Sequence, residues 1–308
     1  MYGTSEGLPT LIETWVFFAL AWCYDSAIMW TRTTFRSMVP SGVIGMVHLR
    51  ALPGSPAWKG DLAQVEAAAL CDADACVHGG ASAVMVENYG DIPFFKDQVP
   101  AVTVAAMTRI IDTIRRTHPS VPLGVNVLRN DVQTALAIAA VTDAAFVRVN
   151  VLTGAAVTDQ GVIEGQAAKA MRLRAELCPE VGILADIRVK HAAPLAARPL
   201  TEEALDLRLR AGADALIVSG SATGAKTDPA LLTELRSAVP DCPLLIGSGS
   251  NVQNLPLYSA ADGAIVGSSL KATGPDGQPM ISSKLVTAYL AAAHFTASVH
   301  STKEADSP

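Results

Sequence analysis

The amino-acid sequence predicts an α/β protein, a (β/α)8 barrel of the TIM type, preceded by an extension. Three observations predict this fold. Short runs rich in Val, Ile and Leu alternate with longer stretches of helical spacing, as expected for parallel strands joined by crossover helices. Eight such units follow Val43, and together they occupy about 250 residues, the usual size of this barrel. A doubly wound open sheet is the alternative, but residues 49–56 lack the glycine fingerprint that usually follows its first strand.

Each predicted strand is a short apolar run whose polar residues come near its carboxyl end. The strands cover residues 43–48, 82–88, 122–128, 146–150, 182–187, 215–219, 243–247 and 264–267. Each strand is followed by a longer segment whose apolar residues recur with helical spacing, which predicts a helix. These helices cover residues 62–77, 101–117, 132–141, 164–177, 202–210, 229–238, 252–258 and 283–293.

Loop lengths distinguish the two ends of the predicted barrel. The segments that lead from a helix into the next strand are short and turn-like, at residues 78–81, 141–144, 211–214 and 259–262. The segments that leave a strand are longer and carry Gly, Pro, Asn and charge, at residues 52–56, 89–93, 152–165 and 188–199. Because loops longer than the minimum usually serve function, we expect the active face at the carboxyl ends of the strands.

The composition excludes several classes of protein. Half of the 308 residues are hydrophobic and 17% are charged, which excludes a disordered chain. The net charge of −6 and the absence of clustered Lys and Arg argue against nucleic acid as a partner. The five cysteines are scattered, with no C-x-x-C motif and no His pair at zinc spacing. We therefore expect a reducing, cytoplasmic compartment and neither a metal ion nor a cofactor.

The first forty residues differ from the rest of the chain. Trp15, Trp22 and Trp30 lie in this segment, and its apolar run at 14–24 is shorter than the roughly 18 residues that a membrane-spanning helix needs. Arg32 and Arg36 leave an organellar presequence or a peripheral membrane anchor open as alternatives. The simplest interpretation is a non-functional extension, with the working chain beginning near Met38. The predicted organisation is an extension at 1–40, the barrel at 41–296 and a polar tail at 297–308.

Polar residues end nearly every predicted strand. Strands of an all-parallel sheet are covered on both sides and are normally apolar throughout, so these residues need a reason. Because eight strand ends converge at the mouth of a barrel, the side chains could share a volume about 10 Å across. The candidate set is His48, Glu87, Asn88, Asn126, Arg148, Asn150, Asp186, Arg188, Lys190 and Ser219.

Two carboxyl groups are the candidate general acids or bases. Apolar walls around Glu87 or Asp186 would raise a carboxyl pKa toward neutrality, which suits proton transfer. His48 is a third catalytic candidate at the same rim. The remaining side chains are expected to orient the substrate or to stabilise an oxyanion, namely Asn88, Asn126, Arg148, Asn150 and Lys190.

Structural alternatives exist for each of these residues. Arg148 and Asp186 fall on neighbouring strands and could form a buried ion pair. His48 could be a satisfied core residue, and asparagines at strand ends could only hold loop backbone. Lys190 could be a Schiff-base amine, although a solvated cation or an anion contact is the simpler interpretation.

Glycine and serine follow the last strands of the predicted barrel. Gly247, Ser248 and Gly249 end the seventh strand, and Gly267 and Ser268 end the eighth. Glycines let the backbone approach a ligand, and serine hydroxyls and N–H groups bind phosphate oxygens. In many barrels the phosphate site lies after strands seven and eight. Ser219 and Gly220, with residues 221–224, form a weaker extension of the same site; the alternative is that these glycines only turn the chain.

Several segments resemble the BtpA family, also called BtpA/SgcQ. They are VIGMVHL at 43–49, ALPGSP at 51–56, VENYGDIPF at 86–94, GVNVLRND at 124–131, RVNVLTG at 148–154, TDQG at 158–161, DIRVKHA at 186–192 and GSG at 247–249. The resemblance runs from about Val43 to Ala293. It implies a barrel akin to the ribulose-phosphate-binding barrels. The family takes its name from a factor needed for biogenesis or stability of photosystem I, and other members are associated with sugar metabolism without a settled reaction.

Two functions of different classes follow. The first is a metal-independent enzyme, a lyase, isomerase or hydrolase, that acts on a small phosphorylated sugar or nucleotide derivative. The second is a non-catalytic assembly or stability factor for a membrane complex, with peripheral membrane association. Homo-oligomers are common among soluble proteins, so a homo-oligomer is an additional expectation.

Overall fold

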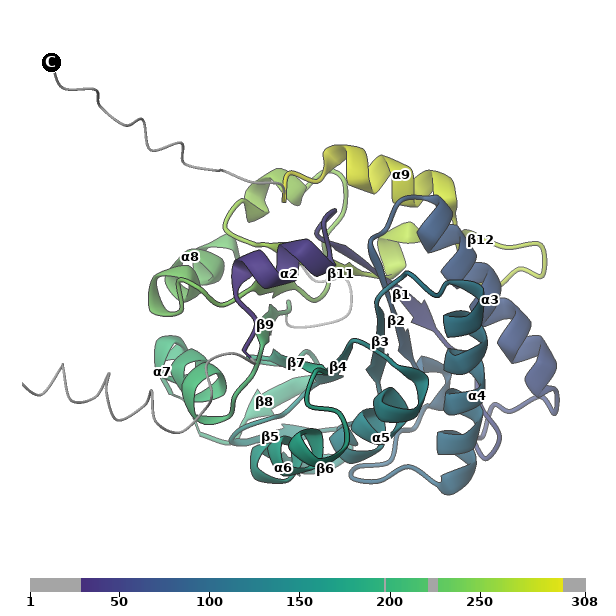
Figure 1. Cartoon of the computed structure of the whole chain (residues 1–308), viewed down its shortest axis with the longest axis horizontal. Coiled ribbons are helices and arrows are strands. Elements are labelled where there is room, and N and C mark those ends of the chain that lie inside the picture. Colours follow the sequence, from purple (N-terminus) through teal and green to yellow (C-terminus); the bar gives the residue numbers. More distant parts are fainter. Residues whose placement is uncertain (1–28, 197, 221–226, 296–308) are drawn as a thin grey trace, which may run out of the picture.

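The computed structural model describes residues 29–196, 198–220 and 227–295, and within them it confirms the predicted barrel (Figure 1). Eight parallel strands form a closed barrel in which each strand pairs with the next along the chain, and the last pairs with the first. These strands are β1 (Val43–His48), β2 (Ala83–Glu87), β3 (Leu123–Asn126), β4 (Phe146–Val149), β7 (Gly182–Asp186), β9 (Ala215–Val218), β10 (Leu244–Ile246) and β11 (Gly263–Val266). Each differs from the predicted strand by a few residues at most.

Helices cover the outer face of the barrel, as its apolar strands require. They are α3 (Leu62–His78), α4 (Ala101–Thr117), α5 (Val132–Thr142), α6 (Ala167–Leu177), α7 (Leu200–Leu205), α8 (Pro229–Ala238) and α9 (Ser283–Ala292). One apolar cluster fills the layer between strands and helices, and a second fills the barrel interior. Among the helices in the described ranges, none combines the length and apolar character that crossing a bilayer requires.

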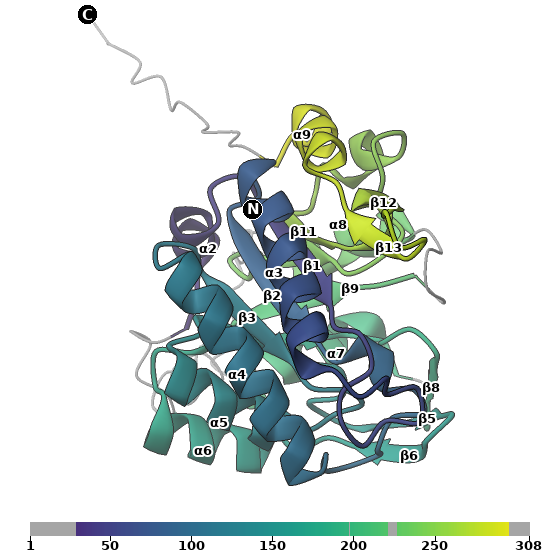
Figure 2. The same ribbon diagram turned by 90° about the vertical axis from the view of Figure 1, so that its right-hand side faces the viewer.

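A short helix closes the amino-terminal end of the barrel. Helix α2 (Arg32–Met38) lies across the end of the barrel opposite to the long loops (Figure 2). Phe35 and Trp30 are buried with the interior side chains of the barrel, and the ring of Trp30 meets that of Phe146 edge to face, with centroids 6.3 Å apart. The packed unit therefore includes Trp30 and Phe35, which lie before the start near Met38 that the sequence suggested.

Two buried carboxylates attach this segment to the barrel. Asp262 accepts hydrogen bonds from Arg32 at 2.7 Å, from Arg36 at 3.2 Å and from Arg236 at 2.5 Å. Asp214 accepts the backbone N–H of Trp30 at 3.1 Å. The two arginines that the sequence analysis associated with a presequence or an anchor thus bind a carboxylate of the barrel.

Two small sheets are additions that the sequence pattern did not predict. Strands β5 (Ala155–Thr158), β6 (Gly161–Glu164) and β8 (Ala192–Pro194) form a three-stranded sheet, and β12 (Lys271–Thr273) pairs with β13 (Pro279–Ile281). The helix predicted at 164–177 consequently begins only at Ala167. The helix predicted at 252–258 is wrong, because that segment contains only a 3-10 turn, Leu255–Tyr258, with Pro256 in its first turn.

Candidate functional site

The register of the first three strands brings three predicted residues side by side. His48 on β1 lies opposite Glu87 on β2, and Glu87 lies opposite Asn126 on β3. All three are the last residues of their strands, so the parallel arrangement places them at the carboxyl end of the barrel. The predicted convergence of polar strand ends is therefore present for these residues.

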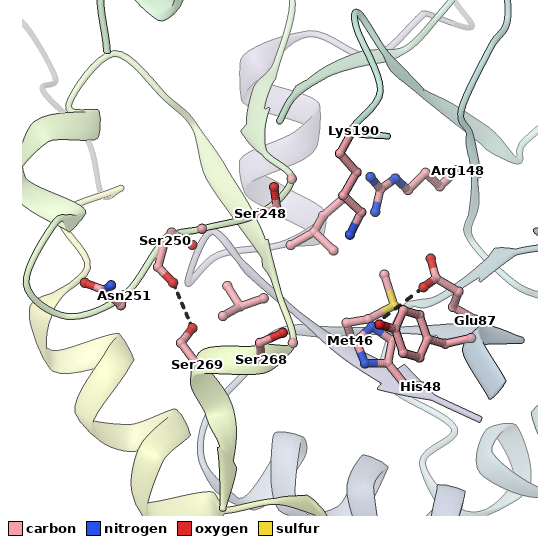
Figure 3. Close-up of a pocket in the computed structure, with 16 residues that line it drawn as sticks. Met46, His48, Glu87, Arg148, Lys190, Ser248, Ser250, Asn251, Ser268 and Ser269 are labelled. Carbon is pink, nitrogen blue, oxygen red and sulfur yellow. Dashed lines mark hydrogen bonds and ion pairs between the residues drawn. The ribbon is translucent and has the colours of Figure 1, made fainter. Parts of the chain in front are cut away.

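Two adjoining cavities open at this end of the barrel, and Figure 3 shows the side chains that line the first. Both cavities are lined by Glu87, Tyr89, Arg148 and Lys190. The first cavity, of about 140 Å³, is otherwise bounded by His48 and the loops after β10 and β11. The second, of about 500 Å³, continues past Arg129 and Asn150. The first suits a single small group, and the second suits a longer part of a ligand.

Glu87 is held at the junction of the two cavities. Its side chain is 6% exposed, and its Oε2 accepts a hydrogen bond of 2.5 Å from the amide of Asn126. Its Oε1 lies 3.6 Å from Nε2 of His48. Among the described residues, Glu87 is the only carboxyl group that lines the first cavity. Asn126 thus positions a carboxyl group that lines the first cavity.

His48 has a defined tautomer. Its Nδ1 lies 3.0 Å from Nζ of Lys271. An ammonium group only donates, so Nδ1 accepts and the neutral ring carries its proton on Nε2, toward Glu87. The ring also stacks on Tyr89, with centroids 4.5 Å apart. Burial lowers the pKa of His48 to about 4, although the nearby Glu87 acts in the opposite direction. At neutral pH His48 is therefore a neutral hydrogen-bond donor.

The lowered pKa of His48 predicts a specific pH dependence of stability. Because the folded pKa lies below the unfolded value, the unfolded chain binds more protons between about pH 6.5 and 4. The stability that this group contributes is therefore fully present above pH 6.5 and is lost as the pH falls toward 4. We expect the free energy of unfolding in urea to fall more steeply over this window in the native protein than in His48→Gln, by on the order of 3 kcal/mol. Parallel pH profiles for the two proteins would contradict the assignment.

Arg148 and Asp186 form the buried ion pair that was the structural alternative for these residues. Nε and Nη2 of Arg148 each donate to Asp186 at 2.9 Å. Asn150 donates to the same carboxylate at 2.8 Å and Ser219 at 3.2 Å. Burial lowers the pKa of Arg148, but the charge and hydrogen bonds of Asp186 outweigh burial and raise it overall. Four hydrogen bonds occupy Asp186, which makes it a partner that orients Arg148.

Lys190 lines both cavities and donates to no described residue. Burial lowers the pKa of its amine, and the nearby charge of Glu87 acts in the opposite direction. In Figure 3 its side chain points toward the space between Arg148 and Ser248. The arrangement suits a cation that contacts a bound anion.

The two glycine-serine loops form one wall of the first cavity. Ser248 Oγ is buried without a hydrogen-bond partner among the described residues, and the N–H groups of Ser248 and Gly249 donate to none of them. Gly249 has φ +71°, which favours glycine. A Cβ at Gly247 would lie 2.3 Å from Oγ of Ser219. Within the described ranges these donors have no acceptor, and donors of this kind bind anions.

The loop after β11 completes this wall. Gly267 and Ser268 both line the first cavity. A Cβ at Gly267 would lie 2.9 Å from Cε1 of His48, so a larger residue there would displace the imidazole ring. The loop that the sequence assigned to phosphate and the histidine that it assigned to catalysis are therefore in direct contact.

Other predicted residues lie away from the two cavities. Asn88 accepts from the N–H of Leu128 at 2.7 Å and donates to Asp91, so it holds loop backbone where the sequence suggested substrate contact. Ser219 faces Asp186, and neither Ser219 nor Gly220 lines the first cavity. The weaker extension at residues 221–224 lies outside the described residues, as does the predicted tail at 297–308.

Sequence reasoning missed three residues of this site. Tyr89 stacks on His48, Lys271 fixes the tautomer of His48, and Arg129 lines the second cavity. Tyr89 and Arg129 lie in loops that follow strand ends, and that position was the available signal. Lys271 begins β12, and no pattern predicted that strand. Among the described residues, no group of three His, Cys, Asp or Glu side chains could hold a metal ion.

Comparisons with known proteins agree with the resemblance seen in the sequence. The chain is 46% identical over 242 residues to "Photosystem I biogenesis protein BtpA" of Synechocystis, which covers 78% of this chain and 83% of that protein. It is 46% identical over 233 residues to an uncharacterized protein of Thermococcus kodakarensis, covering 75% of this chain and 87% of that protein.

Solved structures and a family model complete the comparison. KGPDC from Streptococcus mutans superposes with a TM-score of 0.50 at 11% identity, over 81% of this chain and 95% of that one, and this likeness concerns the fold alone. The model of the BtpA family matches residues 40–294. The chain therefore belongs to the BtpA family.

Proposed function

We propose that this protein is an enzyme that binds a small phosphorylated metabolite, a sugar or nucleotide derivative, and moves a proton on it without a metal ion. The observation that carries the proposal is a set of donors in the first cavity from which no described residue accepts, facing the one carboxyl group that the described lining contains. The phosphate occupies the first cavity, and the rest of the substrate extends into the second. Glu87 stands where the two parts meet.

The phosphate assignment rests on the loops after β10 and β11. Buried polar groups without partners are rare in folded proteins and call for a bound ion, a water or a functional role. Ser248 Oγ is such a group on one wall, and beside it the N–H groups of the half-buried Ser248 and Gly249 donate to no described residue. Lys190 supplies positive charge beside them. A phosphate would satisfy these donors together.

The catalytic assignment rests on Glu87 and His48. Glu87 reaches bound substrate at the junction of the cavities, and Asn126 fixes its direction. His48 presents Nε2–H to the same place and can donate to an oxygen that gains charge while Glu87 takes up a proton. Asp186 fixes the direction of Arg148, whose guanidinium lines both cavities. Isomerisation, lyase chemistry and hydrolysis all use such a proton transfer.

A thermal-shift experiment tests the phosphate assignment. Inorganic phosphate and glycerol 3-phosphate are the probes, with sodium chloride at equal ionic strength as the reference. A ligand present at a hundred times its Kd should stabilise the native protein by about 2.7 kcal/mol. We expect Ser248→Asp to abolish the shift, because a carboxylate in the loop repels phosphate, and Ser248→Ala to reduce it. The proposal is wrong if neither probe raises the melting temperature of the native protein.

A second candidate function is that of an assembly factor. The name of the Synechocystis relative concerns photosystem I biogenesis, and one surface of this chain is compatible with docking. Tyr89, Ile92, Phe95 and Val102 expose 37 to 55% of their surface, the first three between β2 and α4 and the last in the first turn of α4. Neighbouring exposed apolar side chains of this kind often mark contact with another protein or a membrane. This function predicts no dependence on Glu87.

A further inference from the structure

One arginine of the second cavity lacks the partners that its burial requires. Arg129 follows β3 and is only 5% exposed. Its Nη2 donates to the carbonyl of Lys190 at 2.8 Å, whereas its buried Nε has no hydrogen-bond partner among the described residues. Burial lowers the pKa of Arg129, which reflects the cost of holding this charge away from water. A buried guanidinium whose N–H groups lack an acceptor destabilises the fold unless a ligand accepts from them.

Other polar atoms of the second cavity are also unsatisfied. Asn150 donates to Asp186, but its Oδ1 is buried and accepts no hydrogen bond from a described residue. Lys190 lines the same cavity and likewise donates to no described residue. Within the part of the chain that the structure describes, the cavity therefore presents two cations and one amide oxygen that each keep an unused position for a hydrogen bond. A ligand that matches them carries an anionic group and a hydroxyl group.

The charges around the cavity indicate a group with a single negative charge. Asp186 already neutralises Arg148. Glu87 lies between the two cavities, and Asp159 is exposed and accepts from the amide of Gln160 at 2.5 Å. Among the buried groups, Arg129 and Lys190 thus outweigh Glu87 by a single charge, whereas the charge of Asp159, which also acts on the pKa of Arg129, is screened by solvent. Since the planar guanidinium matches the geometry of a carboxylate, a carboxylate suits this position.

We propose that the substrate carries a carboxylate in addition to its phosphate, and that Arg129 binds this carboxylate in the second cavity, with Lys190, which lines both cavities, between the carboxylate and the phosphate. The substrate class is then a phosphorylated hydroxy acid, with a hydroxyl group donating to Oδ1 of Asn150. This inference rests on the proposed function, because it takes the first cavity to hold the phosphate. Arg129 is a specificity-determining residue in this arrangement.

Matched pairs of compounds test the inference. Each pair has a phosphorylated acid and the alcohol that differs only in replacing the carboxylate by a hydroxymethyl group. The pairs are 3-phosphoglycerate with glycerol 3-phosphate, 4-phosphoerythronate with erythritol 4-phosphate, and 6-phosphogluconate with sorbitol 6-phosphate, so that three chain lengths are sampled. We expect calorimetry to show at least tenfold tighter binding of the acid in one pair. In Arg129→Gln the ratio should fall to about one, while the Kd of the alcohol changes less than threefold.

Two controls separate this inference from the proposed function. Ser248→Asp should weaken the acid and the alcohol of a pair equally, because it acts on the phosphate. If the alcohols bind and no acid binds more tightly, the carboxylate assignment is wrong and the phosphate assignment stands. The carboxylate assignment is also wrong if both Arg129→Gln and Lys190→Gln still bind the acid more tightly than the alcohol. If no phosphorylated compound and no inorganic phosphate binds, both proposals fail. If Arg129→Gln does not fold, the carboxylate assignment is tested by the ratio of the two Kd values, alcohol to acid, in the native protein and in Lys190→Gln.

Discussion

A chain that begins at Met38 is expected to be far less stable than one that begins at Met29, although the two differ by only nine residues. The shorter chain lacks Trp30 and Phe35, whose side chains are buried among the interior residues of the barrel. Loss of a buried Trp or Phe side chain typically costs about 3–5 kcal/mol each. Folded domains are stable by only about 5–15 kcal/mol in total. We expect the Met38 chain to be largely unfolded or insoluble at 37 °C, as judged by circular dichroism and urea unfolding.

Point substitutions provide a matched pair for this prediction. Phe35→Ala should lower the free energy of unfolding by about 3–5 kcal/mol, since Phe35 is fully buried. Thr33 is an exposed residue of the same helix, so Thr33→Ala should change the free energy of unfolding by less than about 0.5 kcal/mol. Equal stability of the Met29 and Met38 chains would show that α2 does not contribute to the barrel. It would also restore the interpretation of this segment as an extension.

The role of α2 could not be predicted from the sequence for a physical reason. The helix has seven residues, too few for a hydrophobic period to stand out. Its partners Asp214 and Asp262 lie about 200 residues further along the chain, and only the closure of the barrel brings them to it. By contrast, each barrel strand is an apolar run, and seven of the eight are followed by an α-helix before the next strand or the end of the barrel. The local pattern was therefore sufficient for all eight strands.

The small sheets and the 3-10 turn also could not be predicted from the local sequence pattern. Strands β5, β6 and β8 have three or four residues each, and β8 comes from a different loop than the other two. Their pairing depends on where the barrel places the two loops and not on a local alternation of apolar and polar residues. The segment before Tyr258 was predicted as a helix from its apolar spacing, but it is too short and contains Pro256.

The sequence predicted where the candidate site lies, but it predicted the roles of the site residues only in part. Polar residues at strand ends had to meet at the barrel mouth, so Glu87, Arg148 and the glycine loops were found together. The sequence could not tell which carboxyl group would be paired. Asp186 lies next to β4 and takes the guanidinium of Arg148, whereas Glu87 meets the neutral His48 and Asn126. That difference arises from the register between strands and the reach of side chains across them.

Replacing Asp186 should therefore lower the stability of the protein, whereas replacing Glu87 should abolish turnover and leave the stability nearly unchanged. Asp186→Asn removes the charge that balances a buried guanidinium, and breaking a buried ion pair costs about 3–5 kcal/mol. Glu87→Gln keeps the shape of the side chain and an oxygen that accepts from Asn126, so the free energy of unfolding should change by less than about 1 kcal/mol. Loss of a general base lowers the rate by about 10²- to 10⁴-fold. We expect Glu87→Gln to be a stable protein that binds ligand without turning it over.

Turnover and complementation together distinguish catalysis from scaffolding in the Glu87→Gln protein. Phosphorus NMR can follow any phosphorylated compound that stabilises the native protein, and we expect its conversion to be lost in the variant while binding remains. In a strain that lacks its own family member, the native chain should restore function and Glu87→Gln should not, at equal protein levels. Full rescue by Glu87→Gln would favour the assembly factor, because docking through Ile92 and Phe95 needs no carboxyl group in the barrel mouth. Asp186→Asn cannot make this distinction, because its loss of stability alone would prevent rescue under either function.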